Sequence, residues 1–164
     1  MRTALPGLLL AALALPVPAG RARTADQLFG RWQDQPTHCS LQRQGTSPQT
    51  CRELQLDQRD QAVLRLTLWS PGSQRGFLQQ FTLVGELMPG SEPMRCRDGD
   101  CQLAQPLQLA LSGLSLAEFN GRGLVQGLPQ TWPVQGLCRL TPALITCDAS
   151  GRGGQSWSVK AELR

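Results

Sequence analysis

The sequence of 164 residues contains one histidine, His38, and no tyrosine, and aromatic residues make up only 5% of it. Nucleophilic catalysis of the serine or cysteine type needs a base beside the nucleophile. His38 is the only imidazole available, and it adjoins Cys39 in a segment that we expect to be a loop. The sequence also lacks the Gly-x-Ser-x-Gly turn that carries the nucleophile of many hydrolases. We therefore expect no catalytic residues and no enzymatic activity.

Metal and nucleic-acid sites lack their usual patterns as well. The six cysteines include no Cys-x-x-Cys pair, the spacing typical of structural zinc sites. The acids of Asp98-Gly99-Asp100, even together with Asp148, supply too few oxygens for a calcium cage. The formal net charge is +4, yet no run of basic residues forms a patch, and the Gly-Arg-Gly stretches at 121–123 and 151–154 are interpreted as turns. We expect no metal, no cofactor and no nucleic-acid partner.

The beginning of the chain has an apolar run that is too short to span a bilayer. This run covers residues 4–17 and follows the basic Arg2, as in a secretory signal peptide. Small residues follow the run, so we expect a signal peptide over residues 1–19, with cleavage after Ala22 as the alternative. Residues 20–164 show no second composition block and are expected to form one domain. The sequence predicts an exported protein, periplasmic or secreted, with no stable membrane span after cleavage.

Six cysteines in an exported chain are first interpreted as three disulfides. An Asp-Gly pair suits the two-residue I′ turn of a hairpin, and Asp98-Gly99 lies midway between Cys96 and Cys101. That register makes the two cysteines a non-hydrogen-bonded pair about 4.5 Å apart between Cα atoms, which a disulfide tolerates. We therefore predict a Cys96–Cys101 disulfide.

The second disulfide follows from the same reasoning, and the third follows by elimination. Pro142 suits the first central position of a type I turn, and counting outward from that turn places Cys138 opposite Cys147. Cys39 and Cys51 are then paired by elimination. All six cysteines are thus predicted to be structural.

Alternation of apolar and polar residues dominates the rest of the chain and indicates half-buried strands. The expected strands lie at 51–57, 64–68, 77–87, 106–112, 124–128, 133–140, 144–148 and 157–163, with a first strand beginning near Gly30. Turns rich in Gly, Pro and Ser separate them. Eight or nine short antiparallel strands predict an all-β fold, a single small barrel with a β-sandwich as the alternative, because closure would remove exposed edges.

Two segments favour a short helical turn. Thr24 and Gln27 fit a capping box whose turn would end at Gly30. Ser115 with Glu118 makes a second capping box, and Asn120-Gly121 suits the end of a helix. The second segment could instead continue the preceding strand. The predicted barrel therefore carries one or two helical turns.

Gly30-Arg31-Trp32, after the first of these turns, resembles the beginning of the barrel in lipocalins and the wider calycin superfamily. The resemblance implies an up-and-down barrel in which Gly30 lets the chain turn tightly and Trp32 closes one end. It implies no activity.

The tryptophans suggest one other kind of site. Aromatic rings can stack on a sugar while amides bind its hydroxyl groups, and the sequence has 19 glutamines. Trp69, Trp132 and Trp157 could form such a platform. Packing in the core is the alternative, since alternation places Trp157 on a buried face. Only Trp69, beside a Ser-Pro-Gly turn, is expected at the surface.

Taken together, the sequence favours an exported binding module of the cell envelope or periplasm, stabilised by disulfides. In one version a small apolar ligand occupies the barrel, which a hollow interior would favour and a filled interior would disfavour. The alternative is a secreted inhibitor or envelope protein-interaction partner that uses a loop such as residues 88–94, with its exposed Met, Pro and Gly residues, as a protruding wedge. A hydrolase with two facing carboxylates is a minor alternative.

Overall fold

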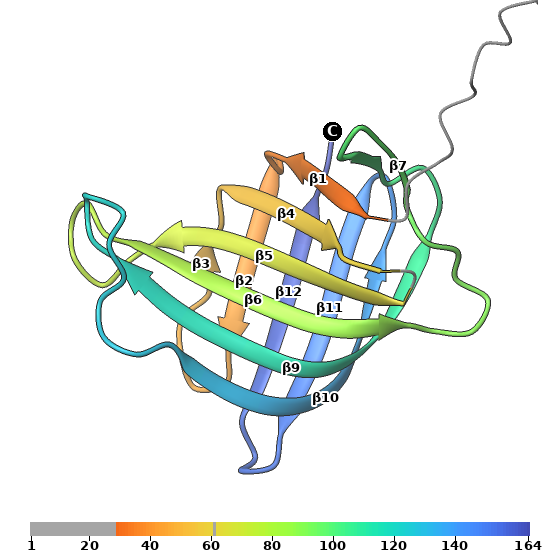
Figure 1. The fold of residues 1–164 in the computed structure, drawn as a ribbon. Helices are drawn as coiled ribbons and strands as arrows, with labels where there is room; N and C mark the ends of the chain where they lie inside the picture. The colour runs from red at the N-terminus through yellow and green to blue at the C-terminus, as the bar shows by residue number, and fades with distance from the viewer. Residues whose placement is uncertain (1–28, 61) are drawn as a thin grey trace, which may run out of the picture.

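The computed structural model describes residues 29–60 and 62–164, and twelve strands within them form one sheet (Figure 1). The strands are β1 (Gly30–Asp34), β2 (His38–Arg43), β3 (Gln49–Thr50), β4 (Glu53–Gln58), β5 (Val63–Pro71), β6 (Leu78–Leu87), β7 (Arg95–Arg97), β8 (Asp100–Gln102), β9 (Leu107–Phe119), β10 (Gln130–Leu140), β11 (Leu144–Gly151) and β12 (Ser156–Glu162). The described ranges hold no helix, and so none that could cross a membrane. The predicted all-β class is confirmed.

The sheet is open and strongly curled. Its strand order is β3-β2-β12-β11-β10-β9-β6-β5-β4-β1-β8-β7, and every pairing is antiparallel except the single bridge between β1 and β8. In Figure 1, β4, β5, β6 and β9 cross in front of β2, β12 and β11, so the sheet wraps round its own concave face. The predicted closed barrel is thus approximated by a curled, barrel-like sheet.

The first four strands form one long hairpin that bends at a corner. β1 pairs with β4 and β2 pairs with β3, while the chain bends at residues 35–37 and again at 51–52. The Cys39–Cys51 disulfide joins the beginning of β2 to the second bend, with 5.1 Å between Cα atoms, and the Arg52 N–H donates to the Trp69 carbonyl of β5 at 2.8 Å. The bends divide two ribbons into four strands, and the short pair β7 and β8 adds two more. The count therefore exceeds the predicted eight or nine.

Both predicted disulfide-linked hairpins are confirmed. Cys96 faces Cys101 with 3.9 Å between Cα atoms, and Asp98 and Gly99 have φ values of 53° and 89°, as a I′ turn requires. Cys138 faces Cys147 at 4.0 Å, as the turn at residues 141–144 predicted. Three disulfides suggest that the protein folds in an oxidising, extracellular environment.

The helical turn predicted at residues 115–121 is wrong. β9 continues to Phe119, where Leu116 pairs with Phe81 of β6 and with Gln130 of β10. Two neighbouring strands satisfy the backbone of β9 on both sides, which outweighs the local capping signal. The Glu118 carboxylate accepts a hydrogen bond from the Ser73 N–H at 2.6 Å, an interaction from another loop that the capping pattern did not anticipate.

The strand predicted at residues 124–128 is also wrong, because only an isolated bridge between Phe119 and Val125 forms there. The remaining predicted strands coincide with β4, β5, β6, β9, β10, β11 and β12, with shifted ends. The capping box at Thr24 and Gln27 lies outside the described residues.

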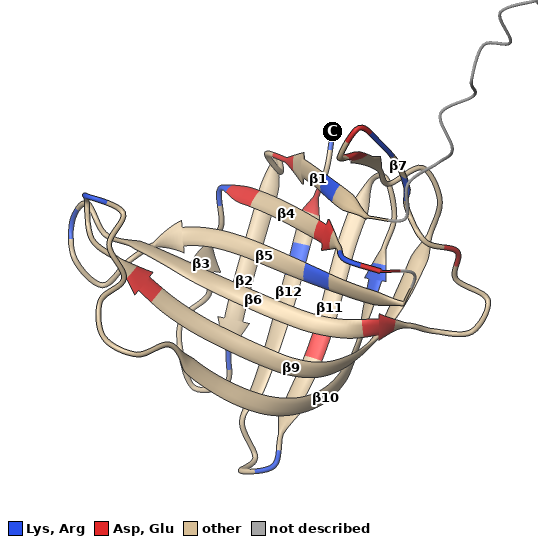
Figure 2. Ribbon diagram, viewed as in Figure 1, with Lys and Arg blue, Asp and Glu red and all other residues tan. Residues whose placement is uncertain are grey.

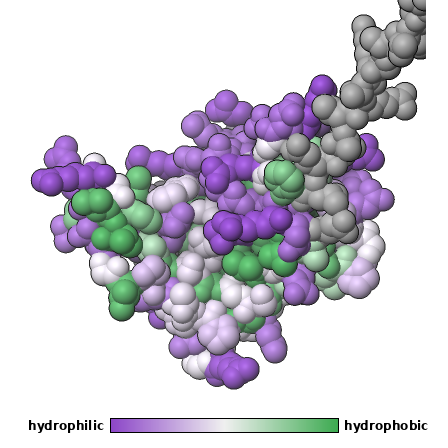
Figure 3. Space-filling view, viewed as in Figure 1, coloured by the Kyte–Doolittle hydropathy of each residue, from purple (hydrophilic) through white to green (hydrophobic). Residues whose placement is uncertain are grey.

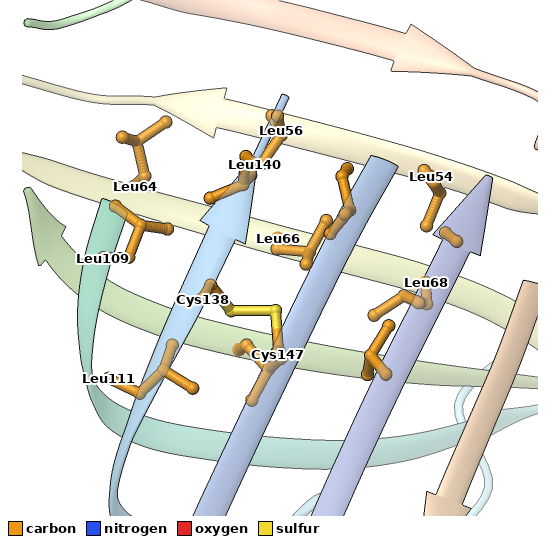
Figure 4. Packing of buried hydrophobic residues seen from close by; sticks show 14 of the residues in the cluster. Leu54, Leu56, Leu64, Leu66, Leu68, Leu109, Leu111, Cys138, Leu140 and Cys147 are labelled. Carbon is orange, nitrogen blue, oxygen red and sulfur yellow. A yellow bond between two sulfur atoms is a disulfide. The ribbon is translucent and has the colours of Figure 1, made fainter. Parts of the chain in front are cut away.

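Leucine side chains fill the concave face of the sheet. Figure 4 shows leucines of β4 and β5 facing Leu109, Leu140 and the Cys138–Cys147 disulfide across the interior. The residues that are 0% exposed are Leu54, Leu56, Leu64, Leu66, Leu68, Cys138, Leu140, Ile145 and Ala161. Each buried leucine contributes about 1.5 to 3 kcal/mol relative to leaving it exposed. The centre is therefore a packed core, and a ligand there would have to displace leucines.

Candidate functional site

Four turns gather at one end of the curled sheet, which we call the loop end. They join β2 to β3, β5 to β6, β9 to β10 and β11 to β12. The antiparallel registers require this grouping, because Arg43 lies opposite Trp157, Val134 opposite Gly151 and Leu78 opposite Phe119. At the loop end, therefore, inward-facing side chains that lie outside the leucine core can be reached from solvent.

A pocket of about 160 Å³, the mouth pocket, lies at the loop end. Its lining residues are Leu41, Arg43, Thr46, Gln49, Gln79, Phe81, Leu116, Trp132 and Trp157. Leu41, Phe81 and Trp157 are buried and form its apolar part, while Arg43 and Gln49 are exposed at its rim. The strands thus place a charged group and amides over an apolar floor.

Two indole rings and a guanidinium define the geometry of the mouth pocket. The ring centroids of Trp132 and Trp157 are 5.5 Å apart, with the planes tilted by 50°. The Arg43 Cζ atom lies 5.8 Å from the centroid of Trp132, within the range of a cation–π contact. No salt bridge among the described residues includes Arg43, so its charge is not neutralised by a carboxylate.

The turn that follows β2 fixes the backbone at Arg43. The Arg43 carbonyl accepts hydrogen bonds from the Thr46 hydroxyl at 2.8 Å and from the Thr46 N–H at 3.0 Å. Gly45 has a φ of 77°, which suits glycine in this tight turn. The Arg43 side chain therefore starts from a well-defined position beside Trp157.

One buried hydroxyl belongs to a residue that is paired with the lining of the mouth pocket. Ser70 is 1% exposed, and within the described chain its Oγ is the sole buried side-chain polar atom without a hydrogen-bond partner. Its cross-strand neighbour in the β5–β6 register is Gln79, which lines the pocket. An unsatisfied buried hydroxyl costs free energy unless a partner reaches it.

The side chains of the mouth pocket are of kinds that can bind a ligand. The described lining of the mouth pocket includes no carboxylate, imidazole or thiol that could act as a base or nucleophile. Tilted indoles accept a flat apolar group, a guanidinium binds an anion, and glutamine amides supply neutral hydrogen bonds.

The sequence-predicted residues fall in several places. Trp132 and Trp157 come together in the mouth pocket, whereas Trp69 contacts Phe119, with 5.5 Å between ring centroids, so the three tryptophans do not form one platform. Arg43 was not identified from the sequence. The available signal was its spacing two residues after the buried Leu41, which places a charge on the inward face of β2.

Gly30 and Trp32 lie in β1, away from the mouth pocket. A Cβ atom on Gly30 would lie 2.5 Å from the Gly99 carbonyl oxygen and 2.8 Å from the Cys101 Sγ, so glycine permits the β7–β8 hairpin to approach β1. The Arg31 N–H donates to that carbonyl of Gly99 at 2.8 Å. Trp32 is half-buried against the core.

The wedge predicted at residues 88–94 is not built on exposed methionines. Met94 is 2% exposed and Met88 is half-buried. The buried Gln58 amide holds Met94 at both backbone atoms: the Met94 N–H donates to Gln58 Oε1 at 2.7 Å, and Gln58 Nε2 donates to the Met94 carbonyl at 3.1 Å. Met94 is therefore part of the core, whereas Pro89 and Gly90 are exposed.

Asp57, which lies outside the mouth pocket, takes part in a network of hydrogen bonds and charges. Burial alone would raise the pKa of Asp57, but hydrogen bonds from Arg31 and Gln55 and the charges of Arg31 and Arg65 outweigh it, so the pKa is lowered. His38 is exposed, and its neighbour Cys39 is oxidised in a disulfide. Within residues 29–60 and 62–164, no three His, Cys, Asp or Glu side chains gather as a metal site would require.

A larger hollow lies on the outer face of β2, β10, β11 and β12. Its volume is about 730 Å³, and glutamine and serine side chains, including Gln42, Gln135 and Ser158, supply half of its lining residues. It is widely open and has no cation or exposed aromatic ring along it. The mouth pocket is therefore the better candidate, although it is smaller.

Comparison with protein-family models, with curated proteins and with solved structures finds no match to this chain. The geometry of the mouth pocket is therefore the basis on which a function can be proposed.

Proposed function

We propose that this protein is an exported binding module whose mouth pocket holds a small ligand with a flat apolar part and an anionic group. The observation that carries the proposal is the position of Arg43 over Trp132 and beside Trp157. The ring surfaces bind the flat part, and the guanidinium binds the anion in a partly apolar setting, where charge-assisted hydrogen bonds are strong. The three disulfides and the expected signal peptide support action outside the cytosol.

The size of the pocket and the filled core together limit the ligand. Sites for drug-sized molecules occupy roughly 300 to 1,000 Å³, whereas the mouth pocket has about 160 Å³. Leucines occupy the space below it. The proposal therefore assigns the mouth, not the interior, to a ligand whose bound part is about one ring with its acidic substituent.

We also propose that the curled sheet is a closed barrel of eight strands. When each bent ribbon is counted once, the pairing passes from β12 to the β1–β2 ribbon, to the β3–β4 ribbon and on to β5. In this view the β7–β8 hairpin covers the end away from the mouth, beside Gly30, and Trp32 closes that end as the lipocalin resemblance implies.

Aromatic acids test the proposal. Benzoate and indole-3-acetate are titrated into the oxidised protein by calorimetry, with benzamide as the uncharged counterpart of benzoate. We expect saturable binding of both acids. Arg43→Gln should weaken benzoate about tenfold or more, because a hydrogen bond to a charged group contributes about 1.5 to 3 kcal/mol, and should change benzamide little.

Arg139→Gln is the matched control, because Arg139 is an exposed arginine on the outward face of β10. It should bind both acids as the wild type does. The proposal fails if neither acid gives a saturable signal, or if the Arg43 and Arg139 variants lose affinity equally.

A further inference from the structure

The loop between β9 and β10 carries an unusual group of exposed apolar side chains, which we call the apolar tip. Leu128 is 93% exposed, Leu124 59% and Val125 48%, and Leu78 at the start of β6 adds a side chain that is 44% exposed. They are four of the five large apolar side chains exposed in the described chain. Figure 3 shows hydrophobic surface at the end of the molecule where these turns lie.

The loop that carries these exposed side chains is held in place by hydrogen bonds. Asn120 Oδ1 accepts from the Arg122 N–H at 3.0 Å and from the Leu124 N–H at 3.1 Å, and the Asn120 N–H donates to the Leu124 carbonyl at 2.9 Å. The Gln126 N–H donates to the Glu118 carbonyl at 2.7 Å, so Val125 is paired with the end of β9. These bonds hold Leu124 and Val125 away from the core.

Positive charges accompany the apolar tip. Arg122 lies in the same loop and Arg75 in the turn between β5 and β6, and both are exposed. The two turns are neighbours, since a Cβ atom on Gly121 would lie 3.5 Å from the Gly76 carbonyl oxygen. Figure 2 shows basic residues in both turns. No salt bridge of the described residues includes Arg75 or Arg122.

The one acid at the base of these turns is Glu118. Its carboxylate is held by the Ser73 N–H, at 2.6 Å, and it therefore faces the turn between β5 and β6. In these two turns, therefore, the two arginines carry more positive charge than Glu118 carries negative charge.

We propose that the apolar tip docks this protein onto an anionic lipid surface. Apolar side chains that enter the headgroup region, together with arginines that bind anionic headgroups, are the combination by which peripheral proteins bind membranes. A protein interface instead has a closely packed core of complementary shape. Leu128 projects singly from a turn and is almost fully exposed, so lipid tails fit it better than a rigid partner surface.

This inference is independent of the ligand proposed for the mouth pocket, because it rests on other residues. The two features share the loop end of the sheet, so a docked molecule would turn its mouth pocket toward the lipid.

Vesicle flotation tests the inference with the full, oxidised protein. The vesicles consist of phosphatidylcholine alone or of phosphatidylcholine mixed with phosphatidylglycerol. We expect binding to the anionic vesicles and at least tenfold weaker binding to the neutral ones, because each arginine near an anionic surface adds to the attraction. The double variant Leu124→Ser and Leu128→Ser should weaken binding to anionic vesicles at least tenfold.

Phe29→Ser is the matched control, since Phe29 is 58% exposed beside β1 at the other end of the sheet. It should bind vesicles as the wild type does. All three proteins are also unfolded in guanidinium chloride, and an unchanged midpoint shows that the leucine variant is folded. A titration with benzoate shows separately whether its mouth pocket is intact.

Three results would overturn the inference. The first is wild-type protein that binds neither kind of vesicle. The second is leucine variants that bind anionic vesicles as tightly as the wild type, which would reduce the effect to charge alone. The third is a leucine-dependent complex with a protein and no vesicle binding. Failure of benzoate binding in the wild type concerns only the mouth pocket.

Discussion

Gly136 stands at an irregular position of β10, where the register with β9 shifts between Pro133 and Gly136. A Cβ atom there would overlap the carbonyl oxygen of Asp148 in β11. Backbone atoms of a paired strand cannot move aside cheaply, so the glycine is needed for close approach of the two strands.

We predict that Gly136→Ala lowers the free energy of unfolding by about 2 to 3 kcal/mol, as other overpacked sites do. Gly113→Ala is the control, because Gly113 lies in the adjacent strand β9, has no positive φ and leaves open space where a Cβ would go. Its effect should stay within about 1 kcal/mol. Guanidinium unfolding measures both, and equal losses would show that the Asp148 carbonyl is not the cause.

The residues of the candidate site could be predicted only in part. Alternation places Trp157 on the inward face, and the same rule applied to Leu41 places Arg43 there too. The sequence did not reveal that Trp132 lies 5.5 Å from Trp157, because that distance depends on the β10–β11–β12 register. The strand order decides which loops lie at the same end of the sheet, and it therefore decides which side chains meet there.

Among the elements, the hairpins were the most predictable. Asp98-Gly99 and the turn at Pro142 specify their own register through turn geometry, so both disulfides followed from local sequence. The corner at residues 35–37 and 51–52 was not predicted, since each bend is stabilised by partners distant in sequence, such as Trp69 for Arg52. The error at residues 115–121 has the same origin, because strand pairing outweighed a local helix signal.

The β10–β11 hairpin illustrates how much one disulfide contributes. Cys138 and Cys147 are 0% and 2% exposed, and their sulfurs lie within the leucine core. The chain-entropy model gives about 2.7 kcal/mol for a loop of this length.

We predict that replacing both residues by alanine lowers the free energy of unfolding by about 3 kcal/mol or more, because lost buried volume adds to the entropy term. Replacing Cys96 and Cys101, which close a shorter loop, should cost less, about 2 kcal/mol on the same model. Guanidinium denaturation without reductant measures both. The reverse order would contradict the placement of Cys138 and Cys147 at the centre of the core.

The whole molecule should lose stability in acid. The pKa values of Asp57, Asp60, Glu118 and Glu162 are all lowered. A carboxyl with a lowered folded pKa stabilises the fold above its unfolded pKa, and this contribution disappears as the pH falls through the folded value. Asp57 is the least exposed participant in a salt bridge here, since its side chain is 13% exposed and Arg31 binds it at 2.8 Å.

We predict that Asp57→Asn is less stable than the wild type at pH 7, by about 1 kcal/mol, because Arg31 is itself 55% exposed and solvent screens the pair. The difference should shrink as the pH falls below the ordinary aspartate value of 3.8. Urea unfolding at a series of pH values measures this. A gap between the two proteins that stays constant from neutral pH down to pH about 2 would contradict the role given to Asp57.

The pairing of β2 with β12 sets the order in which the chain can complete its fold. Ala161 lies opposite Cys39, so the ladder that joins the two ends of the chain spans most of its length. Contacts between such distant segments slow folding, whereas hairpins form early because their loops are short. A chain synthesised from its amino terminus can form the successive hairpins before β12 exists, and β2 gains its partner only once β12 has been made. The wall of the mouth pocket between Arg43 and Trp157 therefore forms after the hairpins that precede β12 in the chain.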